Sequence, residues 1–265
     1  MATSDIEDLL RKLKCVGMLK AFEAQQCHAF SADLSFEERL CILLKAEETH
    51  RADRRRAGLL KKANFKWAHA DLRDLYKNPE RNLDRNKISE LATCVWIEKH
   101  WNVLITGKTG TGKTFLACAL GIRACYEGHS VLFTTLVAFL DELKKAAADG
   151  SFQAHLKSLH RFELLILDDL GQNPVLDAQD CFCLSQFLVD WEGKGSLIVT
   201  SQLPYTEWHA YFSKTYKTGA DAIMGRLTGN TTVIQLMGQS FRNPNDVMGK
   251  RKLGGEGGGE GSIAA

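Results

Sequence analysis

The sequence predicts an α/β protein built on a parallel sheet, preceded by a small domain made only of helices. From about residue 100 onward, short apolar runs alternate with helical patterns, as they do where helices connect the strands of a parallel sheet. The run Leu164–Leu167 has four consecutive apolar residues, which suits a strand buried on both faces. Residues 1–68 carry helical periodicity instead. We therefore predict a helical domain over 1–68, an α/β domain over 69–248 and a disordered tail over 249–265.

The composition is typical of a globular protein without a membrane-spanning segment. Of the 265 residues, 45% are hydrophobic and 25% are charged, and no stretch approaches the ~20 apolar residues that cross a bilayer. The N-terminus lacks the basic start and apolar run of a signal peptide. We expect a cytoplasmic protein with no membrane partner. The eight cysteines form no C-x-x-C pair, so small buried side chains are a simpler interpretation than metal ligands.

Two capping boxes predict helix starts in the N-terminal domain, at Ser4 with Glu7 and at Ser35 with Glu38. Behind the first, apolar residues recur every three or four positions from Ile6 to Phe22, which predicts one amphipathic helix. The second helix is expected to continue to about residue 66.

The second helix carries a basic stripe. Residues 45–66 hold eight Lys or Arg and three acids, a local charge of 8 − 3 = +5 in a chain whose net charge is +2. Such a stripe can neutralise the phosphates of a DNA duplex without reading its sequence, and the alternative is a solvated helix face. The candidate DNA-binding residues are Arg51, Arg54, Arg55, Arg56, Lys61 and Lys62.

The chain between the two domains has less regular patterns. Residues 65–86 keep no apolar period and are expected to be irregular, whereas 87–99 is predicted to be helical. This second stretch leads directly into the apolar run Val103–Thr106, the first predicted strand.

A phosphate-loop motif follows that strand. The segment Gly107-x4-Gly112-Lys113-Thr114 has the G-x-x-x-x-G-K-[ST] pattern between a strand and a helix. Its glycines allow a tight turn whose N–H groups converge on a polyphosphate. The alternative is a Gly-rich turn that binds no ligand. We predict that Lys113 reaches the β- and γ-phosphates of ATP and that Thr114 ligates Mg²⁺. The nucleotide-binding residues would be Gly107, Lys108, Thr109, Gly110, Thr111, Gly112, Lys113 and Thr114.

The remaining elements are predicted in order along the chain. Helices are expected over 114–126, 136–148, a shorter stretch up to 161, 178–191 and 222–227, and strands over 129–135, 164–167, 195–201 and 231–236.

Polar residues end two of these strands. Asp168 and Asp169 follow Leu164–Leu167 at the carboxyl end of the strand, where ligands bind in open α/β sheets. Asp168 would support Mg²⁺ opposite Thr114, and Asp169 would orient and deprotonate water. Gln202 follows another strand, where it lies either beside that water or in a plain strand exit.

Four segments taken together resemble one family. They are Gly107-x4-Gly-Lys-Thr, Leu-Leu-Ile-Leu-Asp168-Asp169-Leu-Gly, Ile-Val-Thr-Ser-Gln202-Leu-Pro-x3-Trp and Gly-Gln-Ser-Phe-Arg242. The chain resembles the IstB family of AAA+ transposition helper ATPases, relatives of the helicase loader DnaC and the initiator DnaA, over nearly its whole length.

The resemblance implies an AAA+ core whose five parallel strands have the order 5-1-4-3-2. It implies that Gln202 is the first sensor, that Arg242 is the second sensor, and that Arg226 is an arginine finger supplied to the ATP of a neighbouring subunit. A finger supplied in trans requires a homo-oligomer. The implied function is an Mg²⁺-dependent ATPase that assembles on and deforms double-stranded DNA for a partner transposase.

Four positions depart from the family pattern. Asp169 stands where Glu is usual, which suggests slow hydrolysis, and Gln202 stands where Asn is common. Gly225 replaces the Asp before the finger arginine, which leaves the placement of Arg226 less secure, and Phe241 replaces Tyr.

Three rival functions remain open at the level of the sequence. A DnaC-like helicase loader would bind a replicative helicase and favour single strands. A small-molecule kinase would also use a phosphate loop but would need no finger in trans. A nucleotide-gated DNA-binding module would turn ATP over too slowly for turnover to matter.

Overall fold

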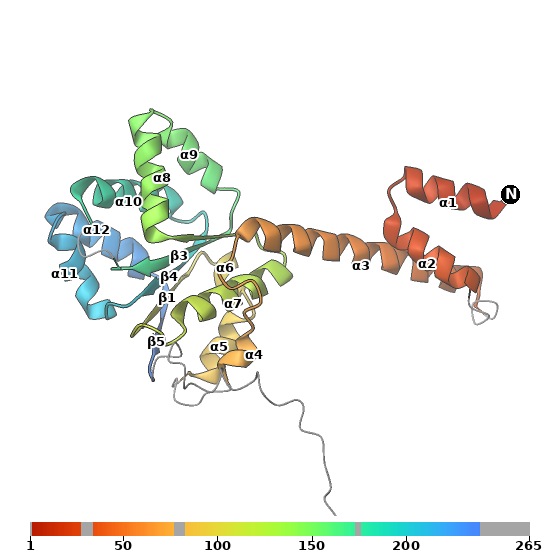
Figure 1. Cartoon of the computed structure of the whole chain (residues 1–265), viewed down its shortest axis with the longest axis horizontal. Coiled ribbons are helices and arrows are strands. Elements are labelled where there is room, and N and C mark those ends of the chain that lie inside the picture. Colours follow the sequence, from red (N-terminus) through yellow and green to blue (C-terminus); the bar gives the residue numbers. More distant parts are fainter. Residues whose placement is uncertain (1, 28–33, 77–82, 173–175, 239–265) are drawn as a thin grey trace, which may run out of the picture.

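A five-stranded sheet lies at one end of the molecule, and a long helix connects it to two further helices at the other end (Figure 1). The structure is a computed structural model, and it describes residues 2–27, 34–76, 83–172 and 176–238. Arg242 and the predicted tail 249–265 lie outside the described residues.

The N-terminal region begins with two helices, so the prediction of one helix is wrong. Helix α1 spans Ala2–Lys12 and α2 spans Val16–Cys27, and between them Lys14 takes a left-handed conformation with φ 58°. The break lets α2 pack against the next helix at Gly17. Ser4 lies inside α1 rather than at its start, so the first predicted capping box is also wrong.

Helix α3 is continuous over Phe36–Ala63, 28 residues, as the sequence predicts. Its capping box is confirmed: the Glu38 amide donates to Ser35 Oγ at 3.2 Å, and the Ser35 amide donates to Glu38 Oε2 at 2.8 Å. The helix ends at Asn64, whose left-handed conformation turns the chain toward the sheet. Helix α3 thus begins beside α2 and ends against the α/β core.

The connecting segment forms three short helices, α4 Leu72–Leu75, α5 Arg85–Leu91 and α6 Val95–Glu98. The helical character predicted for 87–99 is confirmed, but the stretch is divided between α5 and α6. Helix α4 lies within 65–86, which was predicted to be irregular. The chain breaks at Cys94, which has φ 62°, and the break brings Trp96 inward, where its indole N–H donates to the Leu91 carbonyl at 2.9 Å. Burial of an aromatic ring with a satisfied N–H outweighs the continuity of a short helix.

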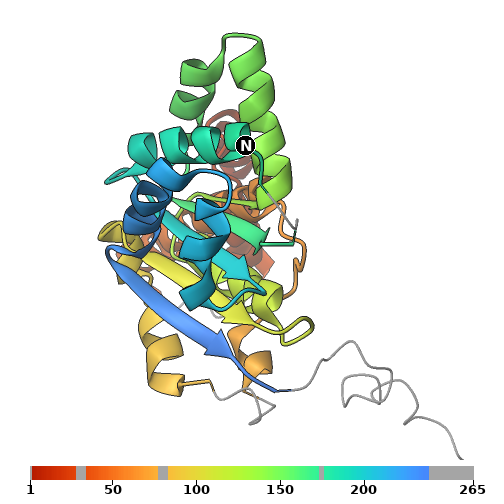
Figure 2. The same ribbon diagram turned by 90° about the vertical axis from the view of Figure 1, so that its left-hand side faces the viewer.

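The sheet has the predicted order and direction. All pairs are parallel and the order is β2-β3-β4-β1-β5, which is 5-1-4-3-2 read from the other edge. Strand β5 forms one edge (Figure 2). The strands are β1 Asn102–Gly107, β2 Val131–Thr135, β3 Leu164–Leu170, β4 Ser196–Ser201 and β5 Thr231–Leu236.

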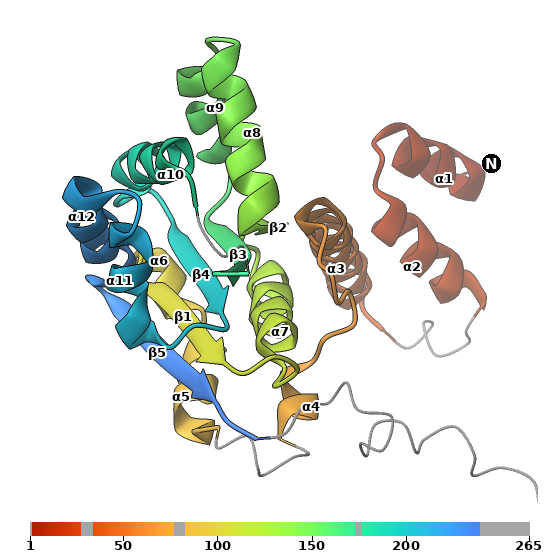
Figure 3. The same ribbon diagram turned by 60° about the vertical axis from the view of Figure 1, so that its left-hand side comes forward.

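Helices follow the strands and cover both faces of the sheet. They are α7 Lys113–Tyr126, α8 Leu136–Ala148, α9 Phe152–Leu159, α10 Ala178–Trp191, α11 Trp208–Ser213 and α12 Lys217–Thr228. Figure 3 shows α7 on one side of the sheet, next to α3, and α10, α11 and α12 on the other. The helix expected over 222–227 is thus longer than predicted and begins at Lys217.

Successive side chains of each central strand enter two separate apolar clusters. In β1, Val103 and Ile105 join the cluster around α7, whereas Leu104 joins the cluster around α8, α10 and α12. This alternation explains why the strands read as unbroken apolar runs. Five of the eight cysteines are buried, whereas Cys27 and Cys41 are exposed, contrary to the sequence interpretation. No helix in the described ranges is both long enough and apolar enough to span a bilayer.

Candidate functional site

The phosphate loop connects β1 to α7, which begins at Lys113. Gly107, Gly110 and Gly112 have φ values of 150°, 84° and 96°, which L side chains rarely adopt. A Cβ on Gly107 would lie 2.5 Å from the Leu236 carbonyl oxygen, so the end of β5 also requires glycine there. The loop therefore has the conformation that its glycines predict.

The side chains of Lys113 and Thr111 stabilise the loop by hydrogen bonds to its backbone. The Lys113 ammonium and the Thr111 hydroxyl each donate to the Lys108 carbonyl at 2.9 Å, and both residues are almost fully buried. Lys113 thus lies under the loop, at the start of the helix whose dipole favours an anion. This arrangement can bind a polyphosphate.

Asp168 is fully buried beside Thr114. The Thr114 hydroxyl donates to Asp168 Oδ1 at 2.8 Å, and the Thr200 hydroxyl donates to the same oxygen at 2.6 Å. Burial raises the pKa of Asp168, as does the charge of Asp169, while the hydrogen bonds from Thr200 and Thr114 oppose the rise. Two neighbouring oxygen ligands at the foot of a phosphate loop fit Mg²⁺, which binds few protein groups and completes its shell with phosphate and water. In the described part of the chain, no group of three or more His, Cys, Asp or Glu offers a fuller metal site.

Asp169 occupies a strained position in β3. Its φ is 65°, its amide donates to the Thr200 hydroxyl at 3.0 Å, and the pairing of β3 with β4 shifts register between Leu167 and Leu170. Asp adopts this left-handed conformation more readily than most residues because its short polar side chain can bond locally. The backbone conformation at position 169 is therefore one that suits Asp.

Gln202 lies beside the phosphate loop. The Thr109 hydroxyl donates to Gln202 Oε1 at 2.7 Å. A pocket of about 410 Å³ opens next to this contact and is lined by residues of the loop, the end of β4 and the end of β5. Gln202 therefore lies next to the phosphate loop, and its role as a sensor stays a prediction.

Arg226 lies near the amino-terminal end of β1, whereas the phosphate loop follows its carboxyl-terminal end. The Asn102 side chain, at the start of β1, donates to the Arg226 carbonyl at 3.1 Å. At about 3.3 Å per residue, the strand separates these points by roughly 17 Å. Arg226 Nε lies 3.2 Å from Glu192 Oε2 as an ion pair without hydrogen-bond geometry. The Arg226 side chain therefore lies far from the phosphate loop of its own subunit.

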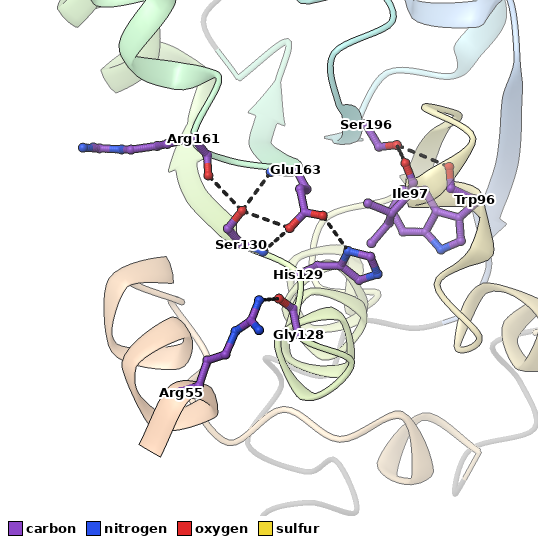
Figure 4. Close-up of polar contacts among 9 residues, drawn as sticks. All are labelled: Arg55, Trp96, Ile97, Gly128, His129, Ser130, Arg161, Glu163 and Ser196. Carbon is purple, nitrogen blue, oxygen red and sulfur yellow. Dashed lines mark hydrogen bonds and ion pairs between the residues drawn. The ribbon is translucent and has the colours of Figure 1, made fainter. Parts of the chain in front are cut away.

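The six predicted DNA-binding residues fall into two groups. Three bind within the protein: Arg51 pairs with Glu47 at 2.7 Å, Arg56 donates to the Tyr126 carbonyl at 3.2 Å, and Arg55 donates to the Gly128 carbonyl at 3.5 Å. Figure 4 shows Arg55 reaching from α3 to the turn after α7, where Glu163 holds His129 and Ser130. Arg54, Lys61 and Lys62 are exposed, and for them the described residues provide no hydrogen bond or ion pair.

Lys66 is a site residue that the sequence reasoning missed. Its ammonium lies 3.7 Å from Asp168 Oδ2 and 3.8 Å from Asp169 Oδ2. The residue follows α3 by three positions and is separated from the two acids by about a hundred residues, so no local pattern could place it there.

The chain is similar to proteins of a known family over most of its length. The model of the IstB-like ATP binding protein family matches residues 8–248. An insertion sequence ATP-binding protein of Sinorhizobium fredii is 40% identical over 236 residues, 89% of this chain and 93% of that protein. The corresponding protein of insertion sequence IS21 in Pseudomonas aeruginosa is 31% identical over 94% of this chain and 91% of its own length. Among solved structures, DnaI superposes with a TM-score of 0.50 at 19% identity, over 69% of this chain and 92% of DnaI, a similarity of fold.

Proposed function

Because the chain belongs to the IstB-like ATP-binding protein family and is an AAA+ ATPase associated with insertion sequences, we propose that it assembles on double-stranded DNA and prepares that DNA for a partner transposase. ATP binding would close the contacts between subunits and deform the DNA, and hydrolysis would reset the assembly. The protein would act in the cytoplasm, where DNA and ATP are both present.

The observation that carries this proposal is the exposed basic face of α3. Arg54, Lys61 and Lys62 are exposed, whereas Leu59, Leu60 and Ala63 of the same helix pack into the cluster around α7. The cations thus face away from the sheet on a rigid helix, which suits contacts with the phosphates of a duplex and little reading of bases. We propose that residues 1–68 act as the DNA- and partner-binding domain and that 69–248 act as the ATPase domain.

The ATPase site would bind Mg²⁺·ATP. The phosphate loop and Lys113 would hold the phosphates, Thr114 and Asp168 would bind Mg²⁺, Asp169 would orient water, and Gln202 would contact the γ-phosphate or that water. We also propose the role of second sensor for Arg242, from the family pattern alone.

Arg226 would complete the site of a neighbouring subunit. It lies near the amino-terminal end of β1, away from its own phosphate loop, and beside a surface pocket of about 280 Å³, so a finger role is compatible only with supply in trans. We therefore propose a homo-oligomer in which each ATP lies between two subunits.

The proposal is tested by measuring DNA binding and particle mass together, with ATP, ADP or no nucleotide, on long duplex and on single strands. We expect large assemblies that form only with ATP and duplex. A preference for single strands would instead favour the helicase-loader function, and a particle of constant mass would contradict assembly.

A pair of double variants tests the basic face. Reversal of charge at Lys61 and Lys62 should weaken duplex binding and reduce its salt dependence, because fewer counterions are released. Reversal at Lys145 and Lys157, exposed on α8 and α9, is the matched control and should change little. Equal effects of the two double variants would show that only net charge matters.

A further inference from the structure

Lys66 connects the end of α3 with Asp168 and Asp169 of the proposed ATPase site. The segment that carries it begins where α3 ends and lies on α7, the helix of the phosphate loop. Three contacts hold it there: Phe65 packs on Gly121, the ring of Trp67 lies 6.4 Å from that of Phe115, and the backbone around Lys66 faces the thiol of Cys118. The position of Lys66 is therefore set by α7.

The absence of a side chain at Gly121 makes the contact with Phe65 possible. A Cβ at position 121 would lie 2.6 Å from Phe65 Cε1 and 2.7 Å from Ile166 Cδ1. The segment after α3 thus lies as close to α7 as the backbone allows. A long side chain three residues after the last residue of α3 can reach the carboxyl ends of the strands from this position.

The ammonium of Lys66 lies beside the buried carboxylate of Asp168. Asp168 Oδ1 accepts from Thr200 at 2.6 Å and from Thr114 at 2.8 Å, and Oδ2 lies 3.1 Å from the Thr114 hydroxyl and 3.7 Å from the Lys66 ammonium. Asp169 Oδ2 lies 3.8 Å from the same ammonium. Two carboxylates so close together repel unless a cation lies between them, and Lys66 supplies one.

We propose that Lys66 is a competing cation at this site, neutralising Asp168 and Asp169 until Mg²⁺·ATP displaces it. The inference rests on the magnesium site proposed above. An ammonium and Mg²⁺ beside the same two carboxylates repel each other and compete for the same oxygens, so binding of Mg²⁺ would favour departure of the Lys66 side chain. The Lys66 side chain, 44% exposed, has room to leave toward solvent.

Displacement of Lys66 would couple nucleotide binding to α3, because the residue lies just after the end of that helix. The side chain that moves is four residues from Lys62, on the exposed basic face of α3. A contact present only before Mg²⁺·ATP binds gives the two states a different connection between α3 and the strand ends. A nucleotide can shift a conformational equilibrium only if it interacts differently with the two states, and loss of the Lys66 contact would provide such a difference.

The test measures how the binding of a fluorescent ATP analogue depends on free Mg²⁺, using the full chain. In Lys66→Met, the free Mg²⁺ concentration at half-maximal binding should fall about three- to tenfold, because the competing cation is gone. Lys145→Met removes the same charge from the exposed face of α8 and should stay within about twofold of the wild type. Lys66→Arg keeps a cation and should resemble the wild type.

The outcomes separate this inference from the functions proposed above. A Lys66→Met midpoint that is unchanged or raised, while wild-type binding depends on Mg²⁺, would overturn the competing role. Wild-type binding that is equal in Mg²⁺ and in EDTA would overturn the magnesium site and the inference with it. Neither result bears on DNA binding, which the assay does not involve. Binding of Mn²⁺ without nucleotide, followed by electron paramagnetic resonance, gives a second readout and should tighten in Lys66→Met.

Discussion

The N-terminal helices and the α/β core are stabilised in different ways. In the core, both faces of the sheet are covered by clusters of fully buried apolar side chains. From α1 to the middle of α3, the buried residues in the described ranges are Leu10, Gly17 and Glu47. Many apolar side chains in this region are exposed instead: Ile6, Leu9, Leu13, Val16, Phe36, Leu40, Ile42 and Leu44.

The contact between α2 and α3 depends on a glycine and a carboxylate rather than on apolar area. Glu47 accepts hydrogen bonds from the amides of Gly17 at 2.7 Å and Met18 at 3.1 Å, at the start of α2, and from Arg51 at 2.7 Å. A carboxylate at a helix N-terminus satisfies amides that have no partner within the helix. The packing of the N-terminal helices therefore depends on a few specific groups, whereas the core is stabilised by many apolar contacts.

The largest expected effect lies in the core and concerns function rather than stability. Lys113→Ala should reduce ATP hydrolysis at least about hundredfold, because the buried ammonium is the cation nearest the expected phosphates. The matched control is Lys108→Ala, since the loop uses the carbonyl of Lys108 and its side chain is exposed. Steady-state phosphate release measures both. A similar loss in the two variants would mean that the loop needs only positive charge.

The next effect would disturb the N-terminal helices alone. In Gly17→Ala, the new Cβ would lie 2.5 Å from the Ala46 carbonyl oxygen and 2.7 Å from Glu47 Cα, both backbone atoms of α3. We expect a cost of about 1–3 kcal/mol to the α2–α3 contact. Hydrogen exchange should quicken in α2 and remain unchanged in β1 and β3. Faster exchange in the strands as well would show that the two regions unfold as one unit.

A pH-dependent effect should also be confined to the N-terminal helices. Burial raises the pKa of Glu47, but the hydrogen bonds from Arg51, Met18 and Gly17 together outweigh it and hold the pKa below its usual 4.5. A lowered pKa in the folded state means that this stabilisation is complete above about pH 4.5 and is lost as the pH falls through the folded value. Protection factors in α2 should therefore fall in acid before those of the core. Glu47→Gln should remove this early loss, and a persistent one would assign it to another group.

The smallest expected effect is a gain of stability in α3. Gly58 lies in the helix with no atom within 4 Å of a new Cβ. Gly58→Ala should stabilise α3 by about 0.5–1 kcal/mol, since alanine loses less backbone entropy. The unfolding temperatures of Gly58→Ala and Gly17→Ala should be compared, because Gly58 has free space around it whereas Gly17 is in close contact with α3. A loss of stability at position 58 would contradict a solvent-facing position there.

The parts of the molecule that were predicted correctly are those whose signal is local. The apolar runs of β1 and β3 and the capping box of α3 are each contained in a few neighbouring residues, and each is confirmed. The phosphate-loop motif belongs to the same class, since its glycines specify the turn wherever it occurs. Helical character over 87–99 was predicted, but the break at Cys94 was not, because it depends on where Trp96 is buried.

The sequence by itself determined the strands, the phosphate loop and the membership in an ATPase family, because each is encoded within a short segment. The tertiary structure decided how the cations are used. It directs Arg55 and Arg56 to the end of α7, leaves Lys61 and Lys62 exposed, and brings Lys66 to Asp168 and Asp169. The physical reason is that a basic side chain has the same local signal whether it faces water, a helix end or a carboxylate, and only contacts between distant parts of the chain distinguish these.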